Sequence, residues 1–247
     1  MKIITLLSFL LISITSFSQK KNIYVTYKKD LINYSINNKN AEKQEAINSM
    51  LNDLKNSSNS LRYNLIINDY ESLFSFEKKL VIDADEKSLT FIVNAGDSGG
   101  DFYMNTKSKE LIRSKHLSGE TFNIISSIDS IKWELTNESK KIGNFDCYKA
   151  KTIKVVENSK GIFNHTVEAW YAPEIPFGFG PAGYGGLPGL IIEIQYQNVR
   201  FFTSKIELNT KKVFKIVKPT KGKEVTKEEY NEITKKMAND FLKSLRK

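Results

Sequence analysis

The sequence predicts a mainly β fold of the α+β class. We expect one antiparallel sheet, open enough to curve into a half-barrel, with one helix in the N-terminal region and an amphipathic helix at the C-terminus. Two observations favour this fold. Between about residues 61 and 217, short β-prone segments follow one another, separated by turn residues, without helices between them. Apolar residues at helical spacing occur before and after that region.

The expected domain begins with a strand and a helix. Apolar and polar residues alternate at the start of Asn22–Tyr34, which predicts a strand. Ala41–Lys55 is expected to be helical, because its apolar residues have helical spacing: Ile47, Met50, Leu51 and Leu54. The strands expected after this helix are Arg62–Asp69, Glu71–Phe76, Leu80–Asp83, Leu89–Asn94, Asp101–Asn105, Leu111–Leu117, Ile131–Glu138, Cys147–Val156, Phe163–Tyr171, Leu190–Gln197, Arg200–Leu208 and Val213–Lys218.

The last segment of the chain predicts the C-terminal helix. Thr226 and Glu229 have the spacing of a capping box, in which each side chain bonds the backbone N–H of the other residue. Val225 and Tyr230 suit a hydrophobic staple around this box. One apolar stripe continues along the helix, formed by Tyr230, Ile233, Met237, Phe241 and Leu245. We expect the stripe to pack on the sheet.

Residues 1–18 have the pattern of a cleaved signal peptide. Lys2 is followed by the short apolar run Ile3–Ile14 and by the small-residue pattern Ser16-Phe17-Ser18. No cysteine lies near this site, so we expect no lipoprotein anchor. Residues 19–247 are then a single domain, and they contain no apolar stretch long enough to span a membrane. The sequence thus predicts a periplasmic or secreted protein.

Charge and cysteine content exclude some classes of protein. The formal net charge is +9, but the lysines are scattered among acidic residues and no basic groove motif occurs, so we expect no nucleic-acid partner. Cys147 is the only cysteine, which rules out an intramolecular disulfide. Its neighbours, Phe145 and Tyr148, favour a small buried residue over a reactive thiol.

A glycine- and proline-rich stretch precedes one of the expected strands. In Leu187-Pro188-Gly189-Leu190, proline suits position i+1 and glycine position i+2 of a type II turn. The loop before this turn, Glu174–Gly186, combines several glycines with Phe177, Phe179 and Tyr184. These aromatic residues could seal one end of the core, or they could grip a ligand.

The stretch Gly186-Leu187-Pro188-Gly189-Leu190-Ile191 resembles the signature of the GLPGLI family, secreted bacterial proteins without an established activity. The segments Cys147–Ala150, Ala169–Pro176 and Gly180-Pro181 are similar to other recurrent segments of that family. The resemblance is close over about Ile142–Tyr196. It implies an exported protein with a single β-rich domain and names no reaction.

The segment Gly96-Asp97-Ser98-Gly99-Gly100 is the strongest indication of a catalytic site in the sequence. It matches the surroundings of the serine in chymotrypsin-like proteases, but no histidine precedes Ser98, as that chain order requires. An α/β-hydrolase order could nominally use Ser98, Asp129 and His165. That arrangement needs a helix after the serine, whereas the sequence predicts a strand there and a hairpin loop at Ala95–Gly100.

Nothing in the sequence indicates a metal or another cofactor. His116 and His165 are the only histidines, and they lack the spacing of a metal-binding motif. The glycine-rich stretch precedes a strand, so it is no phosphate-binding loop. We expect neither a metal site nor a cofactor.

These observations favour a non-enzymatic envelope protein. Its partner is expected to be a lipid or another apolar ligand, or an outer-membrane protein. The candidate binding residues lie at the end of one strand and on the glycine-rich loop: Trp170, Tyr171, Phe177, Phe179 and Tyr184. The alternative is a periplasmic hydrolase that uses Ser98 or a site at His116 and His165.

Overall fold

A computed structural model describes residues 22–32, 34, 36–37, 39–77, 85–158, 161–210 and 214–244. The expected signal peptide at residues 1–18 and the expected strand at Leu80–Asp83 lie outside the described residues. Within the described part, twelve strands form one sheet, accompanied by three α-helices. The expectation of a mainly β fold with an N-terminal-region helix and a C-terminal helix is confirmed.

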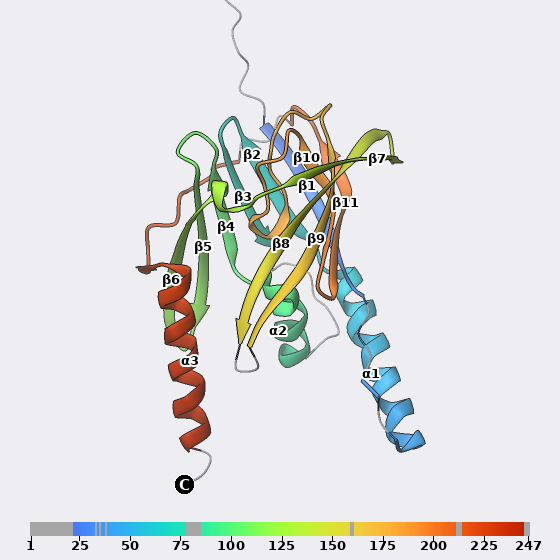
Figure 1. The fold of residues 1–247 in the computed structure, drawn as a ribbon, viewed down its shortest axis with the longest axis vertical. Helices are drawn as coiled ribbons and strands as arrows, with labels where there is room; N and C mark the ends of the chain where they lie inside the picture. The colour runs from blue at the N-terminus through green and yellow to red at the C-terminus, as the bar shows by residue number, and fades with distance from the viewer. Residues whose placement is uncertain are drawn as a thin grey trace, which may run out of the picture.

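The sheet consists of two meanders joined side by side (Figure 1). Neighbouring strands are antiparallel, except that the last strand is parallel to β6. The strand order is β12-β6-β5-β4-β3-β2-β1-β11-β10-β9-β8-β7. The first meander contains β1 (Asn22–Leu31), β2 (Tyr63–Asn68), β3 (Glu71–Phe76), β4 (Asp101–Asn105), β5 (Glu110–Leu117) and β6 (Glu120–Ser127). The second contains β7 (Glu134–Ile142), β8 (Phe145–Asn158), β9 (Gly161–Ala172), β10 (Leu190–Tyr196) and β11 (Val199–Glu207), and the short β12 is Lys223–Val225.

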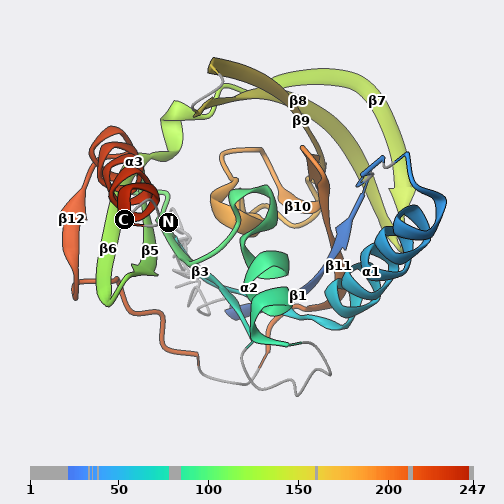
Figure 2. The ribbon, with the colours of Figure 1, turned by 90° about the horizontal axis from the view of Figure 1, so that it is seen from below.

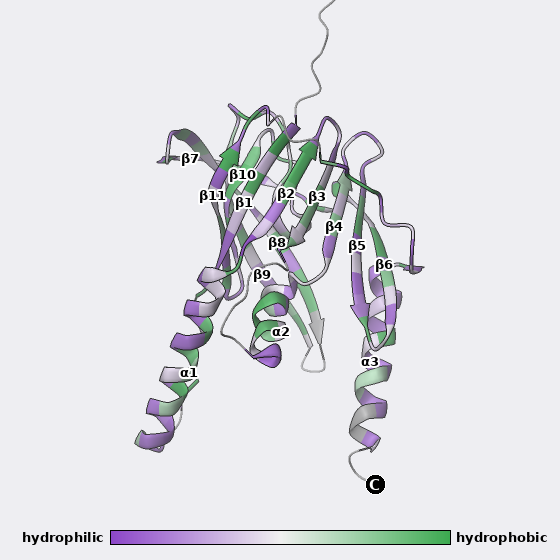
Figure 3. Cartoon of the chain, turned by 180° about the vertical axis from the view of Figure 1, so that it is seen from behind, coloured by the Kyte–Doolittle hydropathy of each residue, from purple (hydrophilic) through white to green (hydrophobic). Residues whose placement is uncertain are grey.

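The sheet curves strongly but does not close into a barrel (Figure 2). Its concave side holds α2 (Glu86–Asn94) and the glycine-rich loop that leads into β10. The other two helices, α1 (Ala41–Ser60) and α3 (Lys227–Ser244), project from the same end of the sheet (Figure 1). α1 is mainly hydrophilic (Figure 3), and only Leu54 and Ser58 of this helix are buried.

The core lies on the concave side of the central strands. Tyr63 of β2 is almost fully buried, and its ring lies 5.8 Å from that of Phe74 and 5.2 Å from that of Phe201. These three rings come from both meanders, so they join the two halves of the sheet. Tyr27 of β1 donates its hydroxyl proton to the carbonyl oxygen of Ile191 at 2.6 Å, which attaches the same layer to β10.

The C-terminal helix begins as the sequence predicts. The backbone N–H of Thr226 donates to the Glu229 carboxylate at 2.7 Å, and Thr226 Oγ1 accepts from the N–H of Glu229 at 3.1 Å. Tyr230 packs edge-on against Phe122 of β6, and Val225 belongs to the same small apolar cluster. The first turns of the stripe therefore contact the sheet, while the expected stripe member Leu245 lies outside the described residues.

The prediction of a strand at Leu89–Asn94 is wrong, because these residues belong to α2. Asp85 caps this helix by accepting from the backbone N–H groups of Lys87 and Ser88 at 2.9 and 3.0 Å. The helix lies inside the curve of the sheet, where no neighbouring strand offers a ladder of hydrogen bonds. The expected hairpin loop Ala95–Gly100 consequently connects a helix with β4 and begins with a 3₁₀ turn at Ala95–Asp97.

Strand β6 was not predicted, and both of its faces are covered. Phe122 and Ile124 face the cluster around α3, and Asn123 between them is fully buried on the other face. In the sequence, apolar and polar residues alternate only over Phe122–Ile124, before the apolar pair Ile124-Ile125 interrupts the pattern. The expected strand at Val213–Lys218 is also wrong, since residues 214–218 have no regular structure.

The expected type II turn at Pro188-Gly189 is wrong as well. The positive φ in this region belongs to Gly186, at +85°, and Gly189 is not among the residues with positive φ. At Gly189 the constraint is space, because a Cβ there would lie 2.3 Å from the carbonyl oxygen of Ala172. Gly189 therefore allows the loop backbone to contact Ala172 at the end of β9.

Replacing Gly189 with alanine is expected to lower the free energy of unfolding by about 1–3 kcal/mol, because the added methyl group collides with backbone atoms that cannot rotate away. Gly143→Asn is the control, since φ there is +59° and a Cβ would meet nothing within 4 Å. Urea denaturation of both variants measures the difference. Equal stability of the two variants would contradict the close approach.

Candidate functional site

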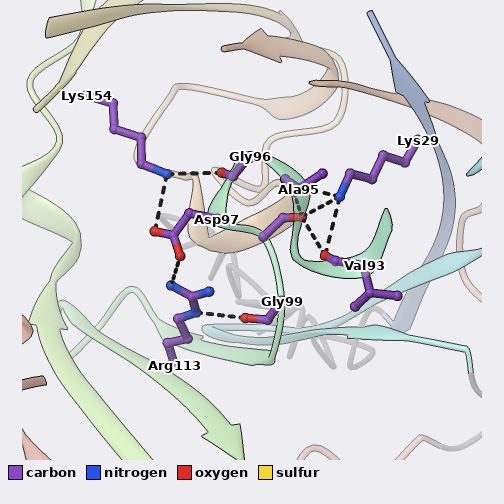
Figure 4. A network of polar contacts seen from close by, with 9 residues as sticks. Lys29, Val93, Ala95, Gly96, Asp97, Gly99, Arg113 and Lys154 are labelled. Carbon is purple, nitrogen blue, oxygen red and sulfur yellow. Dashed lines mark hydrogen bonds and ion pairs between the residues drawn. The ribbon is translucent and has the colours of Figure 1, made fainter. Parts of the chain in front are cut away.

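The ammonium group of Lys29 is directed at the backbone of Val93 and Ala95 (Figure 4), and the buried Ser98 belongs to the same network. Lys29 Nζ donates to the carbonyl oxygens of Ile92, Val93 and Ala95 at 2.6, 3.3 and 2.8 Å, and to Ser98 Oγ at 2.7 Å. The oxygens of Ile92 and Val93 belong to the C-terminal end of α2, where the helix dipole attracts a cation. Ser98 therefore helps to fix α2 to strand β1.

Burial lowers the pKa of Lys29 to about 7. The four oxygen atoms around Nζ oppose this effect, because hydrogen bonds to the charged form favour it. The rings of Phe201 and Tyr63 lie 5.4 and 5.9 Å from Nζ and add a cation–π attraction. Lys29 is thus a buried amine that is held inside the curve of the sheet by hydrogen bonds and aromatic contacts.

The described contacts do not assemble a hydrolase around Ser98. Its Oγ is bonded to Lys29 and to the carbonyl oxygens of Val93 and Ala95, and the residue is only 1% exposed. Asp129 forms an ion pair with Lys109 at 2.7 Å. His116 contacts Thr121, and His165 stacks on Phe163 on strand β9. The nominal triad residues therefore have separate partners.

Asp97 forms a second network beside the first one, between strands of the two meanders (Figure 4). Its carboxylate lies 2.7 Å from Arg113 of β5 and 3.5 Å from Lys154 of β8. Arg113 also donates to the carbonyl oxygen of Gly99 at 2.8 Å, and Lys154 to that of Gly96 at 3.2 Å. The loop between α2 and β4 thus connects the two arms of the open sheet, by which we mean the part around β5 in the first meander and the part around β8 in the second.

Charge and burial act against each other in this network. Burial raises the pKa of the Asp97 carboxyl, but the positive charges of Arg113 and Lys154 outweigh it, so that the pKa lies below its usual value. Burial is also the main influence on Lys154, and it lowers the pKa of that amine despite the nearby Asp97. The Asp97 side chain is half-exposed, so solvent weakens both ion pairs.

A cleft of about 600 Å³ opens above this network. It lies between β4, β5 and β6 on one side and β8 on the other, and the first turn of α3 borders it. Asp97, Arg113 and Lys154 contribute its charged part. Its apolar lining includes Phe102, Leu111, Ile124, Ile125, Ile131, Ile153, Val155 and Ala182. The arrangement suits a partner that is apolar over most of its contact and carries some negative charge.

The five candidate binding residues do not meet at one site. Tyr184 borders the cleft, with its ring 5.0 Å from that of Tyr196 in the core. Phe179 and Tyr171 are buried, at 1% and 6% exposure. Phe177 and Phe179 line a separate hollow of about 310 Å³, and Trp170 lies 4.3 Å from the Lys140 ammonium on the second meander. The loop aromatics thus fill the concave side more than they line an opening.

Sequence reasoning found Tyr184 but missed most of the other residues that line the cleft. Asp97 stood out only as part of a supposed serine motif, and Arg113, Ile153 and Lys154 carried no motif at all. Their convergence depends on the curvature of the sheet, which brings β5 and β8 opposite each other. A usable signal was the pair of exposed apolar residues Ile153 and Val155, which flank a lysine in a long strand.

Comparison with known proteins adds a family relationship over part of the chain. Residues 161–193 match a family model described as "Protein of unknown function (Porph_ging)". The chain is similar to that family over this stretch. The matched stretch runs from β9 through the glycine-rich loop into β10, and its description does not carry the GLPGLI name. A search of curated proteins gave no match.

Two solved structures share the fold. Structures of PNGF-II in space groups C2 and P21 superpose with a TM-score of 0.50, at 15% and 14% identity. The match covers 86% of this chain and 32% of the PNGF-II chain, so the present chain spans about a third of that protein. At this identity the likeness concerns the fold alone.

The described residues give no sign of two further kinds of site. No three histidine, cysteine, aspartate or glutamate side chains among them gather in a way that could hold a metal ion. Burial raises the pKa of the Cys147 thiol to about 11, which disfavours a thiolate.

Among the residues that the structure describes, every helix is too short or too polar to cross a membrane.

The environment of Lys29 predicts a pH dependence of stability. Its pKa is lower in the folded than in the unfolded chain, so the unfolded chain binds more protons between about pH 7 and 10. The free energy of unfolding therefore rises with pH in this window, by at most about 1.4 kcal/mol per pH unit. Below about pH 7 Lys29 is protonated in both the folded and the unfolded chain, so it no longer makes the free energy of unfolding depend on pH.

Lys29→Met is expected to remove this pH-dependent gain. Urea titrations at pH 7, 8 and 9 compare the two proteins, with Lys28→Met as the control for loss of a lysine from the same strand. Parallel pH profiles of the native protein and Lys29→Met would show that the surrounding oxygens keep Lys29 charged throughout.

Proposed function

We propose that this chain is an exported, non-enzymatic envelope protein that binds a protein partner in the cleft between the arms of its sheet. The observation that carries the proposal is the combination of a filled concave side with an open apolar cleft. The glycine-rich loop and α2 occupy the inside of the curve, and Phe179 and Ile92 are almost fully buried there. Part of the accessible apolar surface, including Ile153 and Val155, lies at the cleft.

Exposed apolar side chains gather near the end of the β8–β9 hairpin. Ile153 and Val155 of β8 are 56% and 52% exposed, and Ile162 of β9 is 70% exposed. Phe163, at 39%, pairs with Val156 and therefore lies on the opposite face of the hairpin from these three residues. Such a group of large apolar residues on strands is typical of a surface that is covered by another molecule. The cleft and this hairpin therefore support one continuous interface.

An apolar small molecule is the second candidate occupant. A volume of about 600 Å³ is within the usual range of ligand pockets, and aliphatic side chains line most of it. The cleft opens to solvent on one side, which suits a ligand held along part of its length. An acyl chain with an anionic head would match the charges of Arg113 and Lys154.

Export is part of the proposal and rests on the sequence of residues 1–18. A charged start, a short apolar run and small residues before Gln19 are the features of a cleaved signal peptide. The mature protein would then face the envelope, where an outer-membrane or other envelope protein is available as a partner.

A photocrosslinker in place of Ile153 is expected to give one discrete crosslinked species in intact cells. Replacing Leu208 in the same way is the control, because it is also exposed, at 49%, and lies in the turn after β11. Mass spectrometry of the crosslinked species identifies what is attached. Equal crosslinking from both positions, or none from Ile153, would contradict a partner in the cleft.

If a small ligand occupies the cleft instead, an organic extract of the protein purified from its own envelope should contain a stoichiometric apolar molecule. Native mass spectrometry before extraction measures the bound mass. Replacing Ile125 with glutamate places a charge in the apolar lining and should abolish retention. A clean extract from the native protein would remove this candidate and leave the protein partner.

A further inference from the structure

The outer edge of β8 is unpaired over part of its length. Strand β7 covers β8 only as far as Lys151, which pairs with Glu134 at the start of β7. The next residues, Thr152–Val156, pair with β9 on their inner side, and no other strand of the described chain lies on their outer side. In an antiparallel ladder every second residue directs its N–H and C=O away from the paired neighbour. This segment therefore presents unpaired backbone groups.

The unpaired part of β8 lines the cleft. Thr152, Ile153, Lys154 and Val155 all border it, opposite the residues of β5 and β6. A row of N–H and C=O groups at two-residue spacing is matched best by the backbone of another extended chain. The chemistry of this edge thus points to a peptide strand, since an acyl chain would leave those groups without partners.

This edge has one feature that protects sheet edges, the inward-pointing charge of Lys154, and lacks the others. The covering strand β7 carries Glu134, Glu138, Lys140 and Lys141, and its pairing is interrupted by a register shift. Charges and irregularities of this kind discourage the pairing of edges. The segment beyond it has the β-branched residues Ile153 and Val155 on one face, and its single charge, Lys154, points into the cleft toward Asp97 (Figure 4).

The charges around the cleft indicate the character of the added strand. Arg113, Lys154 and Lys227 line the cleft against two carboxylates, those of Asp97 and Glu228. Lys115 adds a positive charge near Arg113 and Asp97. This excess of cations favours acidic side chains on the partner. They would alternate with apolar ones, because neighbouring strands place side chains on matching faces.

We propose that an extended, acidic segment of a partner protein adds to the sheet as a further strand along Thr152–Val156 of β8. This inference rests on the proposed function, in which the cleft binds a protein, and it specifies how. The opposite end of the sheet shows a related arrangement within the chain itself, where the three residues of β12 pair with Phe122–Ile124 of β6.

The test uses a synthetic ten-residue peptide of alternating valine and glutamate, and measures its binding by isothermal titration calorimetry. Two N-methylated versions carry the methyl groups either on all valine amides or on all glutamate amides. A strand added at one edge uses only every second N–H, so one version is expected to bind at least tenfold more weakly while the other keeps its affinity. A valine–lysine peptide should not bind.

Two further measurements locate the peptide. Amide hydrogen exchange should slow for alternate residues of Thr152–Val156 when the valine–glutamate peptide is present. Lys154→Glu should weaken binding at least tenfold, whereas the control Lys235→Glu, on the exposed side of α3, should leave it unchanged. Failure of the peptide to bind at millimolar concentration, equal loss with both N-methylated versions, or unchanged exchange on β8 would each overturn strand addition.

These outcomes separate the inference from the proposed function. Crosslinking from Ile153 detects a partner in the cleft however it is bound, and does not depend on backbone pairing. A discrete crosslinked protein without exchange protection on β8 would retain the partner and reject the added strand. Absence of the crosslinked species would reject the partner itself.

Discussion

Lys29 holds α2 inside the curve of the sheet through its ammonium group, which bonds the carbonyl oxygens at the end of that helix. A cation without a buried carboxylate beside it is costly, and here polar atoms of uncharged groups replace its water shell. This bond adds to the apolar packing of α2, in which Ile92 is buried in the core and Leu89 and Val93 pack against it. Ser58 of α1 extends the same network by donating to the carbonyl oxygen of Lys29 at 2.7 Å.

The position of α2 in turn determines the charged floor of the cleft. The helix ends at Asn94, and the chain then passes through Gly96 and Asp97, both with positive φ, before it enters β4. A positive φ at a residue other than glycine is unfavourable and persists where the surroundings enforce it. At Asp97 the surroundings are Arg113 and Lys154, one from each arm of the sheet. One carboxylate thereby contacts both sides of the cleft.

Much of the fold follows from local sequence patterns, and the exceptions have physical causes. Strands such as β2 at Tyr63–Asn68 could be predicted because their two faces alternate and turn residues follow them. The helical assignment of residues 89–94 could not, since their aromatic and β-branched side chains favour a strand until the curved sheet is known to leave them no partner. Gly189 was recognised as important, but the reason is contact with Ala172, a residue that only the folded chain brings near.

The candidate site was less predictable than the fold. Ser98 attracted attention as a possible nucleophile, and it is instead a buried acceptor for Lys29. The cleft residues come from β5, β8 and the loop after α2, and no spacing along the chain reveals that they converge. Of the loop aromatics, Phe179 and Tyr184 are buried, whereas Phe177 is partly exposed. The sequence does not show which strands the curved sheet brings opposite each other, and the cleft depends on that arrangement.

The pairing of β1 with β11 has a consequence for how this chain reaches its folded state. Each meander is built from neighbouring hairpins, whereas the seam between them joins residues such as Val25 and Ile206, near opposite ends of the sequence. Contacts of such long range form late, because closing a long loop costs entropy before any contact compensates for it. Until β11 has been synthesised, the apolar strand β1 keeps an open edge. A chain of this topology remains unfinished throughout most of its synthesis, which leaves it in a state that chaperones can hold unfolded.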